Sequence, residues 1–197
     1  MKEILLINVS GVDKPGVTST VTALLSQYQA TVLDIGQAVI HDQLNLAILA
    51  ALPVGVDSDI VSDEVQVCLA PLQMKAKFLP IDEERYQSWV EQQGKPRHIV
   101  TLLARKIDAM HLAMVATVCA DYQLNIDKIV RLSGRMSLDD SDKLGRACVE
   151  FSVRGEARDP QQFRNSLLEL ASQQDIDIAY QEDNIYRRNR QLVVFDM

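Results

Sequence analysis

The chain has 197 residues, 47% of them hydrophobic, and a net charge of −7, which suits a globular protein with room for two small domains. The acidic balance argues against a nucleic-acid partner, because phosphate binding requires clustered Lys and Arg. No apolar run reaches the roughly 18 residues of a membrane-spanning helix, so we expect no membrane partner and a cytoplasmic location.

The first half of the chain predicts six elements in the order strand, helix, strand, strand, helix, strand. The strands are expected at residues 3–9, 31–40, 44–52 and 75–81. Apolar residues from Val17 to Tyr28 recur at helical spacing, and Asp57 or Ser58 can cap the second helix. This order is typical of the α+β class and predicts a ferredoxin-like βαββαβ domain, an antiparallel sheet with both helices on one face.

The second half repeats the same order of elements from Arg97 onward. Its strands are expected at residues 98–104, 126–132, 146–155 and 176–182. The sequence YQATVLDI at 28–35 also resembles YQLNIDKI at 122–129. Together these features indicate an internal duplication with two tandem domains of the same fold.

Four segments follow from this interpretation. They are a first domain at 1–81, a linker at 82–96 with helical character, a second domain at 97–183 and a C-terminal segment at 184–197. An acidic insertion at 133–145 has no apolar period, so we expect it to be a mobile loop.

The sequence GVDKPGV stands between the first strand and the first helix. Asp13 can accept hydrogen bonds from first-turn amides, Pro15 presets the backbone and Gly16 allows another group to approach closely. The unpaired amides of Gly16, Val17 and Thr18 lie at the positive end of the helix dipole and favour a carboxylate or another anion. The simpler alternative is a turn that only caps the helix.

A βαββαβ unit with the motif D-x-P-G at this turn resembles the ACT domain family, the small-molecule sensors of many enzymes of amino-acid metabolism. The resemblance implies an effector site at Asp13, Pro15, Gly16 and Val17, for a small amino acid with serine as first candidate. Asn8, at the end of the preceding strand, is expected to reach the same pocket. The family usually places this site between two modules, and we expect a homodimer formed through exposed sheet edges.

The second copy departs from the motif, because it keeps Asp108 but has Met110 and His111 in place of Pro-Gly. We expect this copy to be mainly structural, or to contribute side chains across an interface. The three cysteines (Cys68, Cys119 and Cys148) are far apart and are expected to be reduced core residues. No familiar catalytic motif occurs in the chain, and we expect no metal site or cofactor within it.

The C-terminal sequence LVVFD at 192–196 resembles the first half of the phosphatase motif of the haloacid dehalogenase family. In that motif Asp196 would be the nucleophile, and a second aspartate would follow just after Met197. The resemblance implies a longer parent enzyme that uses Mg²⁺, in which residues 184–197 connect the two sensing domains to the catalytic domain. We therefore expect this chain alone to be regulatory and inactive.

Two alternatives stay open at this point. The chain could be a free-standing double-ACT regulator of transcription or of another enzyme, with no catalytic half. It could also be a dimerisation module that binds no ligand.

Overall fold

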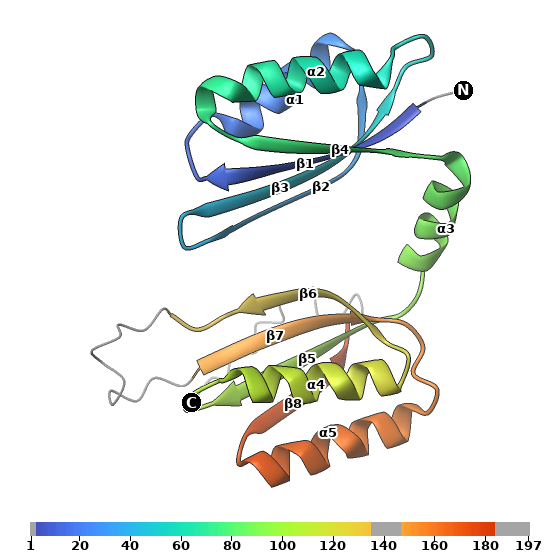
Figure 1. Cartoon of the computed structure of the whole chain (residues 1–197). Coiled ribbons are helices and arrows are strands. Elements are labelled where there is room, and N and C mark those ends of the chain that lie inside the picture. The colour runs from blue at the N-terminus through green and yellow to red at the C-terminus, as the bar shows by residue number, and fades with distance from the viewer. Residues whose placement is uncertain (1–2, 135–146, 184–197) are drawn as a thin grey trace, which may run out of the picture. The chain divides into compact units, whose positions relative to one another are not determined.

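The computed structural model describes residues 3–134 and 147–183, and the chain divides into two compact units between Val90 and Glu91. Each unit has a four-stranded antiparallel sheet with two helices on one face, which confirms the predicted ferredoxin-like α+β class (Figure 1). The expectations for segment 184–197 and for most of the acidic insertion lie outside the described residues.

The first unit has the predicted order of elements. They are β1 (Glu3–Val12), α1 (Val17–Gln27), β2 (Thr31–Ile40), β3 (Gln43–Leu52), α2 (Ser58–Leu69), the short 3₁₀ helix η1 (Ala70–Leu72) and β4 (Lys75–Ile81). The strand order is β2-β3-β1-β4. One boundary differs from the prediction, because Ser10, Gly11 and Val12 continue β1 and pair with β3 instead of belonging to the turn.

The core of the first unit lies between the sheet and the two helices. Alternate residues of β1, such as Leu5, Ile7 and Val9, are buried under the helices, as the period of a strand requires. The helix α1 buries the apolar face predicted for it: Val17, Val21, Leu24 and Leu25. Burial of each large aliphatic side chain contributes about 1.5–3 kcal/mol to the free energy of folding. The strand and the helix on either side of the β1–α1 turn are therefore held in place by the core.

One helix precedes the second unit, which has the predicted order of elements. The elements are α3 (Glu83–Gln93), β5 (Arg97–Ala104), α4 (Ala109–Asp121), β6 (Asn125–Arg131), β7 (Ala147–Arg154), α5 (Pro160–Gln174) and β8 (Asp177–Glu182). The strand order β6-β7-β5-β8 matches that of the first unit. The core contains Val100, Leu102, Phe151 and Phe163, all of them fully buried.

Backbone details support the internal duplication. Both β2 and β6 carry a break of register near their starts. Gln29 and Gln123 adopt left-handed conformations just after the first helix of their units, with φ of 53° and 60°. Gln73 and Asp175 do the same just before the last strand, with φ of 58° and 52°. Positive φ is uncommon outside glycine, so its recurrence at matching points indicates two copies of one unit.

Candidate functional site

The turn between β1 and α1 centres on Gly16, which is the N-cap of α1 and has φ of 100° and ψ of −14°. A side chain at this φ would strain the backbone, so the conformation itself favours glycine. A Cβ atom built on Gly16 would meet no other atom within 4 Å. The surface at Gly16 is therefore open for another molecule to approach.

The first amides of α1 have no acceptor among the described residues. No side chain caps the helix, and the first intrahelical bond joins the Thr20 amide to the Gly16 carbonyl at 2.9 Å. The amides of Val17, Thr18 and Ser19 are left at the positive end of the helix dipole. This end of the helix has the hydrogen-bonding capacity to hold a carboxylate.

The prediction that Asp13 caps α1 is wrong, because Asp13 lies three residues before the N-cap. Its backbone amide instead donates to the Asp42 carbonyl at 2.7 Å, which ties the turn to the β2–β3 hairpin. Within the described residues, no hydrogen bond reaches the exposed Asp13 carboxylate. Nearby, the hydrogen bond of 2.8 Å between His41 and the Asp42 carboxylate raises the pKa of His41 and lowers the pKa of Asp42.

A shallow hollow of about 290 Å³ lies at the start of α1. Its lining includes Asp13, Pro15, Gly16, Val17, Thr18 and Gln37. The structure thus brings together four of the five residues expected to bind a ligand. The Val17 side chain is buried in the core at 1% exposure, so this residue can offer only its amide.

Asn8 is not part of this hollow. It lies in the middle of β1 and is exposed, whereas its neighbours Ile7 and Val9 are buried under the helices. Because successive strand residues point to opposite faces, Asn8 lies on the face of the sheet away from α1. Within the first unit, Asn8 therefore cannot contact a ligand bound at the start of α1. Its contact with a ligand stays a prediction.

Gln37 is a site residue that the sequence reasoning missed. It belongs to the edge strand β2, and its Oε1 atom accepts a hydrogen bond of 2.6 Å from the Thr18 hydroxyl. Its partner in β3, Leu46, is buried under the helices, so Gln37 lies on the helix side of the sheet. The Gln37 carboxamide is held by its oxygen, which leaves the Nε2 donor for a ligand.

Lys14 holds the turn from its other side. Its Nζ atom donates to the Leu72 carbonyl at 3.1 Å and to Gln73 Oε1 at 3.2 Å, across the turn between α2 and β4. The one cation of the motif is therefore engaged with the protein. An anion in the hollow would depend on backbone amides and Gln37 rather than on Lys14.

The equivalent turn of the second unit is capped by its own side chains. Asp108 is the N-cap of α4 and accepts from the His111 amide at 3.0 Å, while the Asp108 amide donates to His111 Nδ1 at 3.3 Å. The hydrogen bond from the His111 amide lowers the pKa of Asp108. Since a carboxylate of the chain already occupies this helix start, the anion site of the first unit has no counterpart here.

Comparison with known families assigns both units. Residues 3–78 match an ACT domain model, and residues 96–181 match another ACT domain model. The chain contains two ACT domains in tandem. The resemblance inferred from the D-x-P-G turn is therefore confirmed, and the second ACT domain belongs to the family although its turn lacks the Pro-Gly pair.

Two curated relatives align with almost the whole tandem ACT chain. Phosphoserine phosphatase of Streptomyces coelicolor is 29% identical over 195 residues, and phosphoserine phosphatase SerB2 of Mycobacterium tuberculosis is 28% identical over 193 residues. Each match covers 98% of this chain. The chain spans only 43% and 44% of the two relatives, which is less than half of their length.

Solved structures share the tandem ACT fold. An unknown protein from Galdieria sulphuraria matches with a TM-score of 0.69, and a structure described as that of a glycine cleavage system transcriptional repressor matches with 0.63. Both are 14% identical to this chain and cover 92% of it. At this identity the likeness concerns the fold alone.

Within residues 3–134 and 147–183, no group of three or more His, Cys, Asp or Glu residues is arranged to hold a metal ion. No helix in the same ranges is long and apolar enough to cross a membrane. Asp196 lies outside the described residues. The predicted nucleophile and the predicted use of Mg²⁺ by a longer enzyme therefore remain predictions.

Proposed function

We propose that the chain is the amino-acid-sensing regulatory region of a phosphoserine phosphatase, whose longer form hydrolyses O-phospho-L-serine to L-serine and phosphate. The observation that carries the proposal is the alignment of 98% of this chain with two phosphoserine phosphatases, of which it spans less than half. Two ACT domains support a regulatory role for this part.

The proposed effector is a small amino acid, with L-serine as first candidate. Its carboxylate would accept hydrogen bonds from the Val17 and Thr18 amides, and Gln37 Nε2 would add a third donor. Its ammonium group would pair with the Asp13 carboxylate, which has no hydrogen-bond partner within the described residues. A hollow of about 290 Å³ is at the lower end of the range for small-molecule sites and therefore suits a small amino acid.

The proposed assembly is a homodimer formed through the edge strand β2. Val32, Ile35 and Val39 of this strand are 45%, 50% and 39% exposed, and its outer edge has no neighbour within the described residues. An exposed apolar edge is a ready site for strand pairing. Because Gln37 lies on the same strand, pairing there would bring the effector site next to the interface.

In the longer enzyme, Asp196 would attack phosphorus while the bond from phosphorus to the serine oxygen breaks, and the second aspartate of the motif would protonate that oxygen. Water would then displace phosphate from the aspartyl-phosphate and free Asp196. The ion Mg²⁺ would supply charge neutralisation for the phosphoryl group. The described residues offer no donor set for that ion, so catalysis would depend on the rest of the enzyme. The cytoplasm remains the expected location of both.

A second candidate is a free-standing ACT regulator. The match to the transcriptional repressor structure covers 98% of that solved chain and 92% of this one, so the tandem fold accounts for nearly all of a chain described as a regulator. The reading frame beyond Met197 distinguishes the two candidates. A stop codon there would favour the free-standing regulator, whereas an open frame that adds the second aspartate of the motif would favour the phosphatase.

Two experiments test the proposed function. First, the complete reading frame is expressed and assayed for release of phosphate from O-phospho-L-serine, with and without added L-serine. We expect hydrolysis whose rate changes with serine. Second, the twenty amino acids are titrated into this chain and into Asp13→Asn, and we expect serine to bind the chain and to bind the variant more weakly. No hydrolysis by the complete protein would contradict the phosphatase assignment, and no binding of any amino acid would contradict the sensing role.

A further inference from the structure

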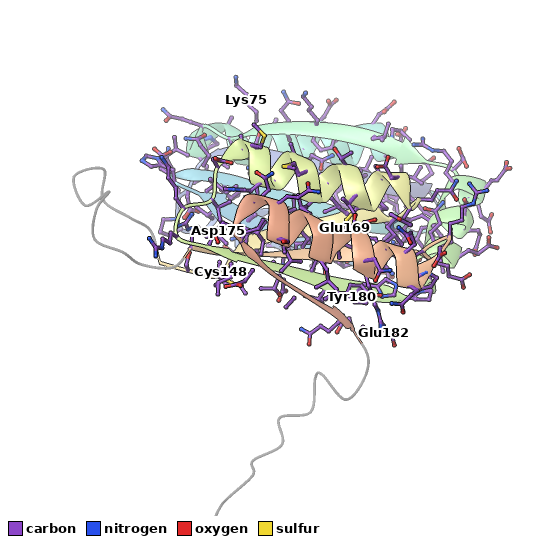
Figure 2. All side chains as sticks on the ribbon, turned by 90° about the horizontal axis from the view of Figure 1, so that it is seen from below. Lys75, Cys148, Glu169, Asp175, Tyr180 and Glu182 are labelled. Carbon is purple, nitrogen blue, oxygen red and sulfur yellow. The ribbon has the colours of Figure 1, made fainter. Side chains whose placement is uncertain are left out.

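The second ACT domain contains a groove of about 720 Å³, larger than the hollow at Gly16. It runs between the β5–α4 turn and the turn that joins α5 to β8, and its lining includes Arg105, Lys106, His111, Gln174, Asp175 and Asp177. Figure 2 shows Asp175 at the end of α5, where the chain turns into β8. The volume lies within the range of small-molecule sites.

In the first domain side chains fill the equivalent place, which is the end of its first strand, whereas the second domain leaves it open. Ser10 pairs with Lys75 in the first domain and Leu103 pairs with Asp177 in the second, so these pairs are equivalent. The next residue along the first strand is Gly11 in one domain and Ala104 in the other. Gly11 packs so tightly on Met74 that an added Cβ would lie 2.7 Å from its sulfur.

In the first domain Lys14 bridges the β1–α1 turn and the turn before β4. Its ammonium group donates hydrogen bonds to the Leu72 carbonyl and to Gln73 Oε1. The second domain has Asp175 in the place of Gln73, and in the described part of the chain no side chain makes the corresponding bond to it. The space that Lys14 spans in the first domain is therefore free in the second.

Charges of both signs line the open groove. Arg105 and Lys106 follow β5, whereas Asp175 and Asp177 flank the start of β8, and all four are exposed. None of the four makes a salt bridge or a side-chain hydrogen bond within the described ranges. Lys106 contributes electrostatically to the lowered pKa of Asp108, but only as the last of several causes.

His111 also lines the groove beside the basic turn. Its Nδ1 atom lies 3.3 Å from the Asp108 amide nitrogen and 3.1 Å from an Asp108 carboxylate oxygen, so Nε2 is the ring nitrogen left to face a ligand. The side chain is only 15% exposed, which fixes the ring in the lining. The basic turn thus offers donors through Arg105 and Lys106, and the Asp175–Asp177 turn offers acceptors.

We propose that this groove binds a small zwitterion of the α-amino acid class. Its anionic group, a carboxylate or a phosphate, pairs with Arg105 and Lys106, and its ammonium group pairs with Asp175 and Asp177. The site is separate from the one at Gly16 and does not depend on the proposed function. The second ACT domain would then bind its own ligand, even though Asp108 already caps the start of α4.

The test is an NMR titration of the isotope-labelled chain with L-serine, O-phospho-L-serine and inorganic phosphate, each up to about 10 mM, the range for weak sites. We expect one or both zwitterions to shift the amide signals of Arg105, Lys106, Asp175 and Asp177. Serine tests the carboxylate alone, and O-phosphoserine tests whether a phosphate is preferred. Phosphate, which lacks the ammonium group, is expected to bind at least fivefold more weakly than the better zwitterion.

The double variant Asp175→Asn/Asp177→Asn should weaken binding at the groove at least fivefold and leave the signals near Gly16 responding as before. The matched control is Asp121→Asn/Glu169→Gln, which makes the same change of charge on exposed residues of the same unit outside the lining. Absence of shifts with both zwitterions would overturn the proposal, as would equal binding of phosphate or an equal loss in the control. Because the signals of the two sites are separate, a silent Gly16 site would not obscure this result.

Discussion

Replacing Gly16 by Ala tests whether the hollow at the start of α1 is the effector site. At φ of 100° the alanine costs about 1–2 kcal/mol of backbone strain, offset by about 0.4–1 kcal/mol from the reduced freedom of the unfolded chain. The net loss in the free energy of unfolding is about 1 kcal/mol. That loss corresponds to about 4–8 °C in the melting temperature of a domain of this size.

Gly55→Ala provides a matched control. Gly55 has φ of 90°, and its added Cβ would also meet nothing within 4 Å, so the backbone cost is nearly the same. Gly55 lies between β3 and α2 and does not line the hollow. The two variants should therefore lose similar stability without ligand, and only Gly16→Ala should place a methyl group in the effector site.

The assay is thermal unfolding with and without L-serine. At a hundredfold excess over its dissociation constant, a ligand that binds only the folded state adds about 2.7 kcal/mol. We expect this stabilisation in the chain and in Gly55→Ala, and its loss in Gly16→Ala. If Gly16→Ala keeps the full response, or if Gly55→Ala also loses it, the reasoning about this hollow is refuted.

Three further predictions concern chemistry, packing and assembly. The chain alone should release no phosphate from O-phospho-L-serine above a buffer blank, and turnover that persists in Asp196→Asn would contradict its regulatory assignment. Burial raises the pKa of the Cys119 thiol from 9.0 to about 11, so the unfolded thiol ionises first. Between pH 9 and 11 the free energy of unfolding should then fall by about 2 kcal/mol more in the chain than in Cys119→Ala, as measured by urea titration. Parallel pH curves for the two proteins would contradict this. Light scattering should give about twice the chain mass of 22.1 kDa, reduced toward that value by Val39→Lys, whereas 22.1 kDa at every concentration would exclude the dimer.

The regular elements were predictable because their signals are local. The face of α1 from Val17 to Leu25 repeats at helical spacing, and each strand is a short apolar run between turn residues. The sequence alone ends β1 too early, because Ser10 and Gly11 have turn propensity. In the structure their backbone pairs with β3, and this non-local pairing outweighs their own preference.

The site was predictable only where its residues are neighbours in the sequence. Pro15, Gly16 and Val17 come from one turn, whereas Gln37 reaches the hollow through the register of β2 against β3. The contact of Lys14 with Gln73 joins residues 59 positions apart, and no local pattern indicates it. The capping role given to Asp13 failed because the left-handed Gly16 delays the start of the helix.

Calorimetric titration of L-serine into this chain tests the sensing role most directly. The account predicts saturable binding in the chain and in Gly55→Ala, and weaker or absent binding in Asp13→Asn and Gly16→Ala. No heat above that of dilution up to about 10 mM serine, or equal affinity in all four proteins, would contradict it.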